Sequence, residues 1–305
     1  MAKEVYTSIK LSYDYLERKE LKEIFLLCSR MGRTYDASVP DLFRYGWGLG
    51  LFEKFNTMEE ALSSVYVLVN TLKAASLLLN APKSEYTSRS PDSERFAMHD
   101  VVCDVARLIA SRDSHVFIVI DDVIPRSWIN ENTLRKCTSI TLHNISELSE
   151  DIQLVCPKLK FLYIKPKESF SRIPDNFFTQ MPGIQVLHLV EMDLQVIPTS
   201  LSWLANLQAL CLDQCELGDT TIIGDLKKLE ILSFHDSDIE KLPEQMRKLT
   251  KLRLLDLSDC SKLSVVPPKV MSSLTELEAL YMGIPLSNGR LKDQKLEEVM
   301  SALMS

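Results

Sequence analysis

A six-residue frame recurs in the sequence as LQALCL (residues 207–212), LEILSF (229–234) and LRLLDL (252–257). Apolar residues hold the first, fourth and sixth positions of each copy, and the copies begin 22 or 23 residues apart. Alternation of apolar and other residues at the end of the frame is typical of a short strand with one buried side. The pattern therefore predicts a strand that recurs at a fixed period.

The same frame extends in both directions, with copies that begin 22 to 25 residues apart. Its residues are Cys137/Ile140/Leu142, Leu159/Leu162/Ile164, Ile184/Leu187/Leu189, Leu207/Leu210/Leu212, Leu229/Leu232/Phe234, Leu252/Leu255/Leu257 and Leu277/Leu280/Met282. One copy cannot bury its apolar side, whereas stacked copies share a core. We predict a leucine-rich repeat solenoid of the α/β type, a horseshoe of about seven repeats over residues 137–305.

Small side chains follow three copies of the frame, at the third position after its last residue: Cys215, Ser237 and Cys260. A small polar side chain at this turn can bond the main chain of the neighbouring repeat, which predicts a hydrogen-bonded ladder. The alternative is a set of reactive or metal-binding thiols. The seven cysteines form no CxxC pair and no Cys/His cluster, so we predict neither a disulfide framework nor a metal site.

Residues between the frame leucines should point away from the core, onto the concave side of the sheet. This side is mixed in character and becomes acidic in the later repeats, which favours a docking surface for a protein with basic groups. An ordinary solvated sheet is the alternative. The predicted partner-binding residues are Tyr163, His188, Glu191, Asp213, His235, Asp236, Asp256, Asp259 and Tyr281.

The first 111 residues show helical periodicity. Val5, Ile9, Tyr13 and Leu16 share one side of a first helix, Leu21 to Cys28 form a second, Pro40 starts a third, and Thr57 with Glu60 makes a capping box for a fourth. Short strands are expected at Ser76–Leu79 and Arg95–Met98, followed by a helix from His99 to Ser111. Helices with a β-hairpin predict a winged-helix domain over 1–111, joined by a linker over 112–136, and an α+β fold overall.

Charge argues against a nucleic-acid partner. The formal net charge is −7, and residues 1–120 hold 15 Lys and Arg against 16 Asp and Glu, so no basic recognition surface is evident. Apolar runs are far shorter than the roughly 20 residues of a membrane-spanning helix, and the first residues lack the apolar core of a signal peptide. We predict a cytoplasmic protein without a transmembrane segment.

Five motifs carry a family resemblance: IKLSYDYL (9–16), FLLC (25–28), DLFRYGWGLGLF (41–52), LKAASLLL (72–79) and MHDVV (98–102). Together with the repeats, the chain resembles plant intracellular nucleotide-binding leucine-rich repeat (NB-LRR) disease-resistance proteins of the coiled-coil class, truncated at the N-terminus. The resemblance implies that residues 1–111 are the winged-helix part of a nucleotide-binding (NB-ARC) module.

In that family, the histidine of the Met-His-Asp triplet lies against the phosphate of bound ADP. The resemblance therefore implies that His99 senses the nucleotide and that Asp100 orients it, because a histidine can donate to a phosphate oxygen. The alternative is that Asp100 only caps a helix that begins at Val101.

Two departures from the family limit this inference. The sequence has no GxxxxGK[ST] loop to cradle phosphates, and the Gly46/Gly48/Gly50 run favours close helix packing. We therefore expect no ATPase activity, no cofactor in this chain, and ADP or ATP only if an upstream nucleotide-binding region exists. Arg30-Met-Gly-Arg33 also replaces the family's acidic, proline-containing segment, which puts that loop's contacts in doubt.

The resemblance implies a plant innate immune receptor-like protein that acts in defence against pathogens and catalyses no reaction. Its repeats would be a protein-recognition and autoinhibitory surface, and its partner a pathogen effector or a guarded host protein. Two alternatives remain open. The chain could be part of a longer ADP/ATP-binding signalling switch, or a decoy that regulates full-length receptors by binding them.

Overall fold

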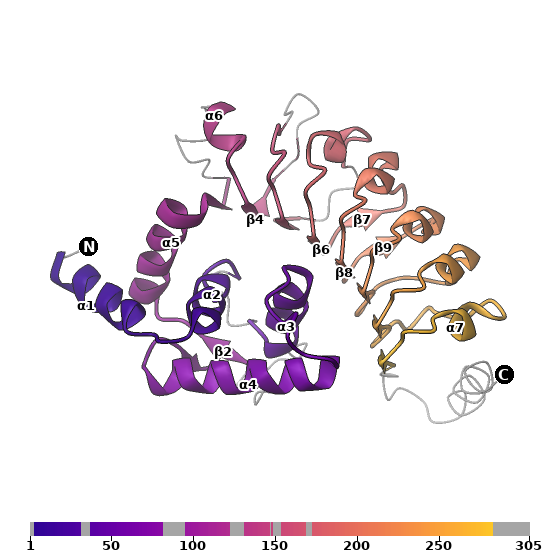
Figure 1. The fold of residues 1–305 in the computed structure, drawn as a ribbon. Coiled ribbons are helices and arrows are strands. Elements are labelled where there is room, and N and C mark those ends of the chain that lie inside the picture. Colours follow the sequence, from indigo (N-terminus) through magenta and orange to yellow (C-terminus); the bar gives the residue numbers. More distant parts are fainter. Residues whose placement is uncertain are drawn as a thin grey trace. The chain divides into compact units, whose positions relative to one another are not determined.

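The computed structural model describes residues 3–31, 37–81, 95–122, 131–146, 148, 154–168 and 173–282. The chain forms two compact units, residues 1–118 and 119–305 (Figure 1). Parts of the predicted polar hairpin (82–94), the Arg30–Arg33 segment (32–33), the linker (123–130) and the repeat domain (283–305) lie outside the described residues.

The first unit consists of helices and one small antiparallel sheet. Strands β1 and β2 pair Leu79 with Ala97 and Asn80 with Phe96. The elements are α1 (Lys3–Asp14), α2 (Lys19–Cys28), α3 (Val39–Gly48), α4 (Met58–Ala74), β1 (Leu79–Asn80), β2 (Phe96–Ala97) and α5 (Asp100–Ser114).

Side-chain caps fix the starts of α3 and α4. The main-chain N–H of Glu60 donates to Thr57 Oγ1 at 3.2 Å, and the N–H of Asn56 donates to Glu60 Oε2 at 3.3 Å. The predicted Thr57 cap of α4 is therefore confirmed, while the Glu60 carboxylate accepts from the residue before the cap, where a capping box would use the N–H of the cap residue itself. Ser38, with Pro40 in the first turn, caps α3 in the same way.

Apolar side chains from α2, α3 and α4 form the core of this unit; Ile24, Phe25, Leu42, Val65 and Leu72 are buried. Helix α1 is attached less closely. None of its residues with described burial is buried, and Val5, predicted to face inward, is 41% exposed.

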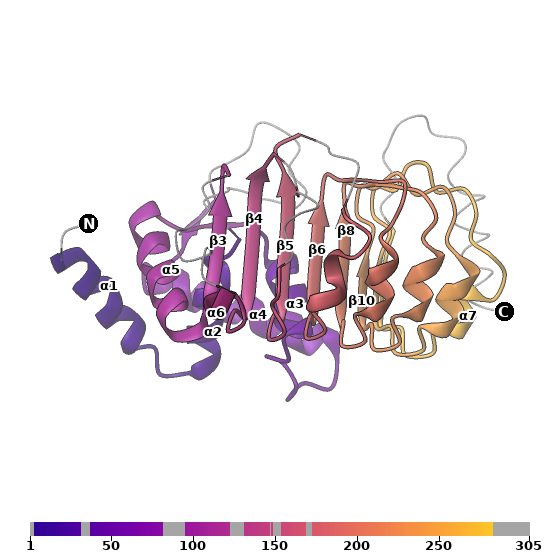
Figure 2. The ribbon, with the colours of Figure 1, turned by 90° about the horizontal axis from the view of Figure 1, so that it is seen from above.

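The second unit is built on one eight-stranded sheet in the order β12-β11-β10-β8-β6-β5-β4-β3. Neighbouring strands from β4 to β12 pair in parallel, and Figure 2 shows β4, β5, β6 and β8 side by side. The strands are β3 (Val116–Ile120), which crosses the boundary between residues 118 and 119, β4 (Ser139–Ile145), β5 (Phe161–Pro166), β6 (Val186–Val190), β8 (Ala209–Asp213), β10 (Ile231–Ser233), β11 (Leu254–Asp256) and β12 (Ala279–Tyr281).

Short helices return the chain between strands, and they lie on the outer side of the arc that this unit forms in Figure 1. They are α6 (Glu131–Leu134), η3 (Phe177–Gln180), η4 (Thr199–Trp203), η5 (Thr221–Asp225), η6 (Glu244–Lys248) and α7 (Val270–Ser273). Strands β7 (Asp193–Leu194) and β9 (Glu216–Leu217) pair separately. The frame leucines at 207, 210, 229, 232, 252 and 255 are each 0% exposed, as a shared solenoid core requires.

The connection between the units differs from the expected linker. Helix α5 continues to Ser114, and β3 joins the sheet beside β4. Val116 and Val119 are 4% and 2% exposed, so this strand has apolar residues to bury. The sheet therefore begins one strand before the first recognisable frame.

Candidate functional site

Parallel register places one residue from each strand in a row across the sheet. Thr141 pairs with Tyr163, Tyr163 with His188, and His188 with Cys211; the row continues through Ser233, Asp256 and Tyr281. Side chains two residues apart on a strand share a side, so this row lies on the side opposite the frame leucines. The structure thus brings four of the nine predicted partner residues into one line.

The middle of this row carries a polar cluster. His188 Nε2 lies 3.1 Å from Asp213 Oδ2, and Ser233 Oγ donates to Asp213 Oδ1 at 2.7 Å. The Tyr163 ring meets the His188 ring edge-on, with centroids 5.3 Å apart. These contacts join four neighbouring strands, β5, β6, β8 and β10, through side chains.

Burial divides the nine predicted residues. His188 and Asp213 are each 1% exposed and Asp256 is 4% exposed, so these three predicted partner-binding residues are buried and do not present a surface to a partner. Tyr163 and His235 are half-buried. The exposed members are Glu191, Asp236, Asp259 and Tyr281.

The sequence analysis named Glu191, Asp236 and Asp259 as partner-binding residues but missed the shared backbone conformation that places them in a second row. The residue two positions after the last frame residue has a left-handed backbone in five repeats: Asn144 (φ 53°), Glu191 (56°), Gln214 (56°), Asp236 (53°) and Asp259 (60°). Side chains other than glycine, asparagine and aspartate rarely adopt this conformation. The enrichment in Asn and Asp at one fixed position of the repeat was the available signal.

This left-handed row carries the exposed negative charge of the predicted docking surface. Glu191, Asp236 and Asp259 are exposed. Lys165 Nζ pairs with Glu191 Oε1 at 2.5 Å, and Gln214 Nε2 donates to Asp236 Oδ2 at 3.0 Å. The turn at each strand end therefore presents a carboxylate or amide at a regular interval.

The predicted ladder is confirmed at the next position of the repeat. Cys215 Sγ donates to Leu189 O at 3.5 Å, Ser237 Oγ to Leu212 O at 2.6 Å, and Cys260 Sγ to Phe234 O at 2.9 Å. Burial raises the pKa of the Cys260 thiol to about 12, which opposes a reactive-thiolate role. Among the described residues, no group of three or more His, Cys, Asp or Glu side chains is placed to hold a metal ion.

His99 caps α5. The main-chain N–H of Val101 donates to His99 Nδ1 at 3.2 Å, and both His99 and Asp100 are exposed. The alternative in which Asp100 caps a helix beginning at Val101 is wrong, because the helix begins at Asp100 and His99 is its cap. Since Nδ1 accepts a hydrogen bond, the neutral imidazole carries its proton on Nε2.

The nucleotide site that the resemblance implies at His99 and Asp100 stays a prediction. His99 Nε2 at the start of α5 could donate to an anionic oxygen. The glycine run serves a different purpose: a Cβ on Gly46 would lie 2.4 Å from Phe52 Cε2, so Gly46 allows close packing of that ring. Without a phosphate loop in the sequence, these residues do not make a complete nucleotide site.

No family model matches the chain. Curated proteins of Arabidopsis thaliana do match it. Disease resistance protein At4g27190 is 29% identical over 287 residues, which cover 91% of this chain and 28% of that protein. Disease resistance protein RPS5 is 29% identical over 306 residues, 94% of this chain and 32% of that protein, and probable disease resistance protein At1g12290 is 30% identical over 258 residues, 82% and 26%.

The chain is a homologue of plant NB-LRR disease resistance proteins. The aligned regions extend across both units of the structure, so the family resemblance is confirmed. The chain spans about a quarter to a third of the length of these relatives. In the part of the chain that the structure describes, no helix is long and apolar enough to cross a bilayer.

Solved structures give weaker matches. A TLR13–ssRNA13 complex matches with a TM-score of 0.45 and 22% identity, covering 57% of this chain and 24% of that chain. An internalin from Listeria monocytogenes matches with a TM-score of 0.39 and 18% identity, covering 57% of this chain and 54% of that one. The repeat fold of this chain rests instead on its strand pairing and on the burial of its frame residues.

Proposed function

We propose that this chain acts in plant defence as an immune receptor-like protein, and that its repeats recognise another protein. The observation that carries the proposal is the similarity to disease resistance proteins over 82% to 94% of the chain. We assign it no catalysed reaction and place it in the cytoplasm. The partner would be a pathogen effector or a guarded host protein.

The left-handed row is the part of the sheet that best suits protein recognition. Glu191, Asp236 and Asp259 are exposed at successive strand ends, which would favour a partner with basic side chains and make association sensitive to salt. Tyr281, which is 43% exposed, adds an aromatic side chain of the kind enriched at binding surfaces. His188, Asp213 and Asp256 would act by ordering this surface, since they are buried.

Leaf tissue that expresses the chain and is challenged with a pathogen provides the test. We expect the chain to change pathogen growth or cell death, and Asp236→Asn with Asp259→Asn to reduce the effect. Asparagine removes both charges and keeps a residue that tolerates a left-handed backbone. The matched control is Asp225→Asn with Glu244→Gln, which removes two exposed charges from η5 and η6.

The amount of the expressed protein must be equal in all the leaf samples that are compared. If the two double variants and the unchanged chain behave alike, recognition does not use the left-handed row. If the chain has no effect on the response at all, the proposed role in defence is wrong for this chain by itself.

We further propose that residues 1–111 are a winged-helix domain that restrains signalling together with the repeats. Helices α1 to α5 and the β1–β2 hairpin support this assignment. The alternative of a nucleotide switch is favoured by one observation, the Nε2 of His99 at the start of α5. An upstream nucleotide-binding region would be needed to complete that site.

Titration with ADP separates these two proposals. We expect the chain alone to bind ADP more weakly than about 1 mM, because one imidazole donor supplies little binding energy. Saturable binding that is much tighter, and that is lost in His99→Ala, would favour the switch. His235→Ala, a change of the same kind in the other unit, is the control.

A further inference from the structure

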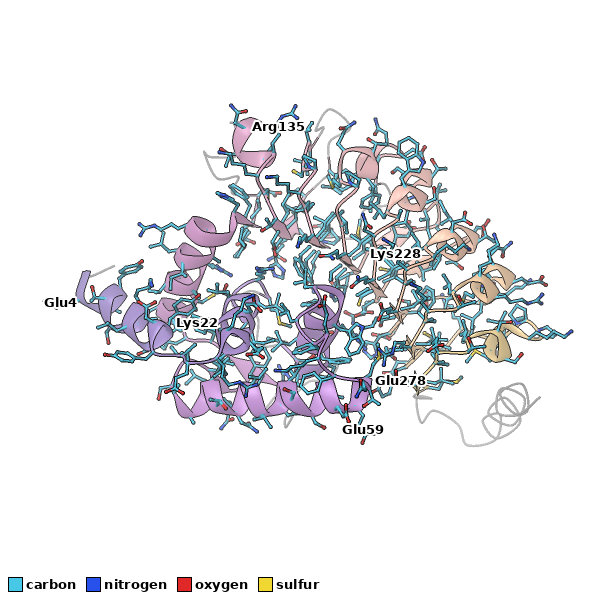
Figure 3. The ribbon with its side chains drawn as sticks, in the orientation of Figure 1. Glu4, Lys22, Glu59, Arg135, Lys228 and Glu278 are labelled. Atoms are coloured by element: carbon cyan, nitrogen blue, oxygen red, sulfur yellow. The ribbon has the colours of Figure 1, made fainter. Side chains whose placement is uncertain are left out.

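Four residues lead into each of the strands β4, β5, β6, β8, β10, β11 and β12. Because these strands are parallel neighbours, the segments lie side by side along one rim of the sheet, which we call the starting rim. Figure 3 labels three residues of this rim, Arg135, Lys228 and Glu278, and shows them spread along the arc of the second unit. The segments are residues 135–138, 157–160, 182–185, 205–208, 227–230, 250–253 and 275–278.

The starting rim is strongly basic. All of its basic residues except Arg253 are exposed. Lys227 Nζ donates to Gly224 O at 2.6 Å and Lys228 Nζ donates to Asn206 Oδ1 at 2.8 Å, so these two lysines bond oxygens that carry no charge. Eight basic residues stand against three acidic ones: Arg135, Lys136, Lys158, Lys160, Lys227, Lys228, Lys251 and Arg253 against Glu230, Glu276 and Glu278.

The opposite rim, where the strands end, has the opposite charge. In residues 191–194, 214–217, 236–239 and 259–262, which begin at the left-handed row, six acidic residues stand against Lys262: Glu191, Asp193, Glu216, Asp236, Asp238 and Asp259. A strand of five residues such as β6 is about 17 Å long. Salt screens charges beyond about 8 Å under physiological conditions. The acidic rim therefore does not cancel the attraction of the starting rim for a negatively charged surface.

Exposed apolar side chains are scarce along the starting rim. Its segments lie wholly within the described residues, and none of them contains an exposed large hydrophobic residue. Trp203, which ends η4 two residues before the segment 205–208, is 63% exposed. Protein interfaces are depleted in lysine and depend on buried apolar anchors, whereas a cluster of basic residues is sufficient to attract anionic lipids. Tryptophan is also enriched at the level of lipid headgroups. This composition favours a membrane surface over a soluble acidic protein.

We propose that the starting rim binds the surface of an anionic membrane, with its lysines against the phospholipid headgroups and Trp203 at the interface. Anionic phospholipids give the cytoplasmic leaflet its negative surface potential, and a protein in the cytoplasm meets that leaflet. The acidic left-handed row then faces away from the lipid and stays open to a protein partner. Membrane binding thus uses a different rim and a different class of partner from the proposed protein recognition.

Sedimentation of the purified full chain with lipid vesicles tests this proposal. Vesicles of phosphatidylcholine with phosphatidylserine should bind the chain, pure phosphatidylcholine vesicles should not, and added salt should weaken the binding. Lys158→Gln with Lys251→Gln removes two exposed charges that form no ion pair with a described carboxylate. This double variant should bind about tenfold more weakly or less, because each lysine near an anionic surface contributes a severalfold gain in affinity.

Lys241→Gln with Lys262→Gln is the matched control. It makes the same change in net charge, at exposed residues that follow strands β10 and β11, and should leave binding nearly unchanged. Trp203→Ala should also weaken binding, since it removes the aromatic side chain from the interface. Circular dichroism of each variant shows whether a loss of binding comes from unfolding.

Two results would show that the starting rim does not bind lipid: equal binding to the two kinds of vesicle, or equal weakening by the two double variants. Soluble polyglutamate and single-stranded RNA present negative charge without a lipid surface. Tighter binding to either polymer than to the vesicles, at equal concentrations of negative charge, would assign the rim to a soluble acidic partner and overturn the proposal.

Discussion

The hydroxyl of Ser237 donates a hydrogen bond of 2.6 Å to the main-chain oxygen of Leu212, one repeat earlier. The hydroxyl oxygen of Ser237 also accepts a hydrogen bond of 2.9 Å from the main-chain N–H of Cys215. Ser237 is 1% exposed, so water cannot easily replace either bond. One small side chain thus satisfies two buried main-chain groups and ties two repeats together.

Replacing Ser237 with alanine should lower the free energy of unfolding by about 1–3 kcal/mol, because buried main-chain groups lose their partner. Cysteine is the matched control, since Cys260 donates from the equivalent position to Phe234 O at 2.9 Å. Chemical denaturation followed by circular dichroism measures both variants. A Ser237→Ala variant as stable as the unchanged chain would mean that the ladder contributes nothing to stability.

Substitutions at Asp259 test whether the left-handed backbone of this row restricts which side chain is tolerated. Its φ is 60°, a conformation in which a β-branched side chain clashes with its own main chain. Asp259→Val should therefore lower the free energy of unfolding by about 1–3 kcal/mol, the usual cost of such backbone strain. Asp259→Asn, which tolerates this φ, should leave stability nearly unchanged. Equal midpoints for the two variants in urea would mean that the left-handed backbone at residue 259 does not select its side chain.

The frame and the caps were predictable because each depends on residues close together in the sequence. The LxxLxL spacing determines which side chains enter the core. Thr57 lies three residues before Glu60, and its hydroxyl oxygen accepts a hydrogen bond from the N–H of Glu60. The small residues Cys215, Ser237 and Cys260 could be assigned to a ladder for the same reason: a period of 22 or 23 residues brings equivalent positions together.

Burial on the opposite side of the sheet could not be predicted in the same way. His188 and Asp213 are polar, and alternation along a strand states only that they point away from the frame leucines. Their 1% exposure and their 3.1 Å contact depend on neighbours far apart in the chain. The role of His99 as a cap was also missed, because histidine is not among the usual capping residues.

The close contact of Gly46 with Phe52 predicts that the effect of a substitution at Gly46 on stability depends on the side chain at position 52. A Cβ at position 46 would lie 2.4 Å from Phe52 Cε2, and the Phe52 ring is 2% exposed. Helix propensity favours alanine over glycine by about 1 kcal/mol, but overpacking a core costs about 1–3 kcal/mol. Gly46→Ala should therefore destabilise the first unit.

The residue at position 52 determines whether Gly46→Ala stabilises or destabilises the protein. In a Phe52→Leu variant the space opens, so adding Gly46→Ala should stabilise the protein and not destabilise it. Thermal unfolding of the two single variants and the double variant measures this coupling. Additive effects would show that the close approach of Gly46 to Phe52 has no energetic consequence.

Asp122 and Ser146 form a contact whose pH dependence has a definite sign. The Ser146 hydroxyl and N–H donate to Asp122 at 2.5 and 2.8 Å, and these hydrogen bonds hold the pKa of the Asp122 carboxyl below its usual range. A carboxyl with a lowered pKa in the folded state stabilises the fold above its unfolded pKa of about 3.9. That contribution is lost as the pH falls through the lower, folded-state pKa.

Ser146→Ala should therefore raise the pKa of Asp122, because the hydroxyl bond is the largest cause of the shift and the main-chain N–H remains. Ser146→Thr keeps the hydroxyl and should leave the pKa lowered. Carboxyl titration by NMR follows Asp122 in both variants. Because Asp122 is exposed, its contact with Ser146 is open to water, and a high salt concentration should weaken charge effects on the pKa more than the hydrogen bond. If Ser146→Ala and Ser146→Thr titrate alike in high salt, the hydroxyl is not what stabilises the ionised carboxylate at this turn.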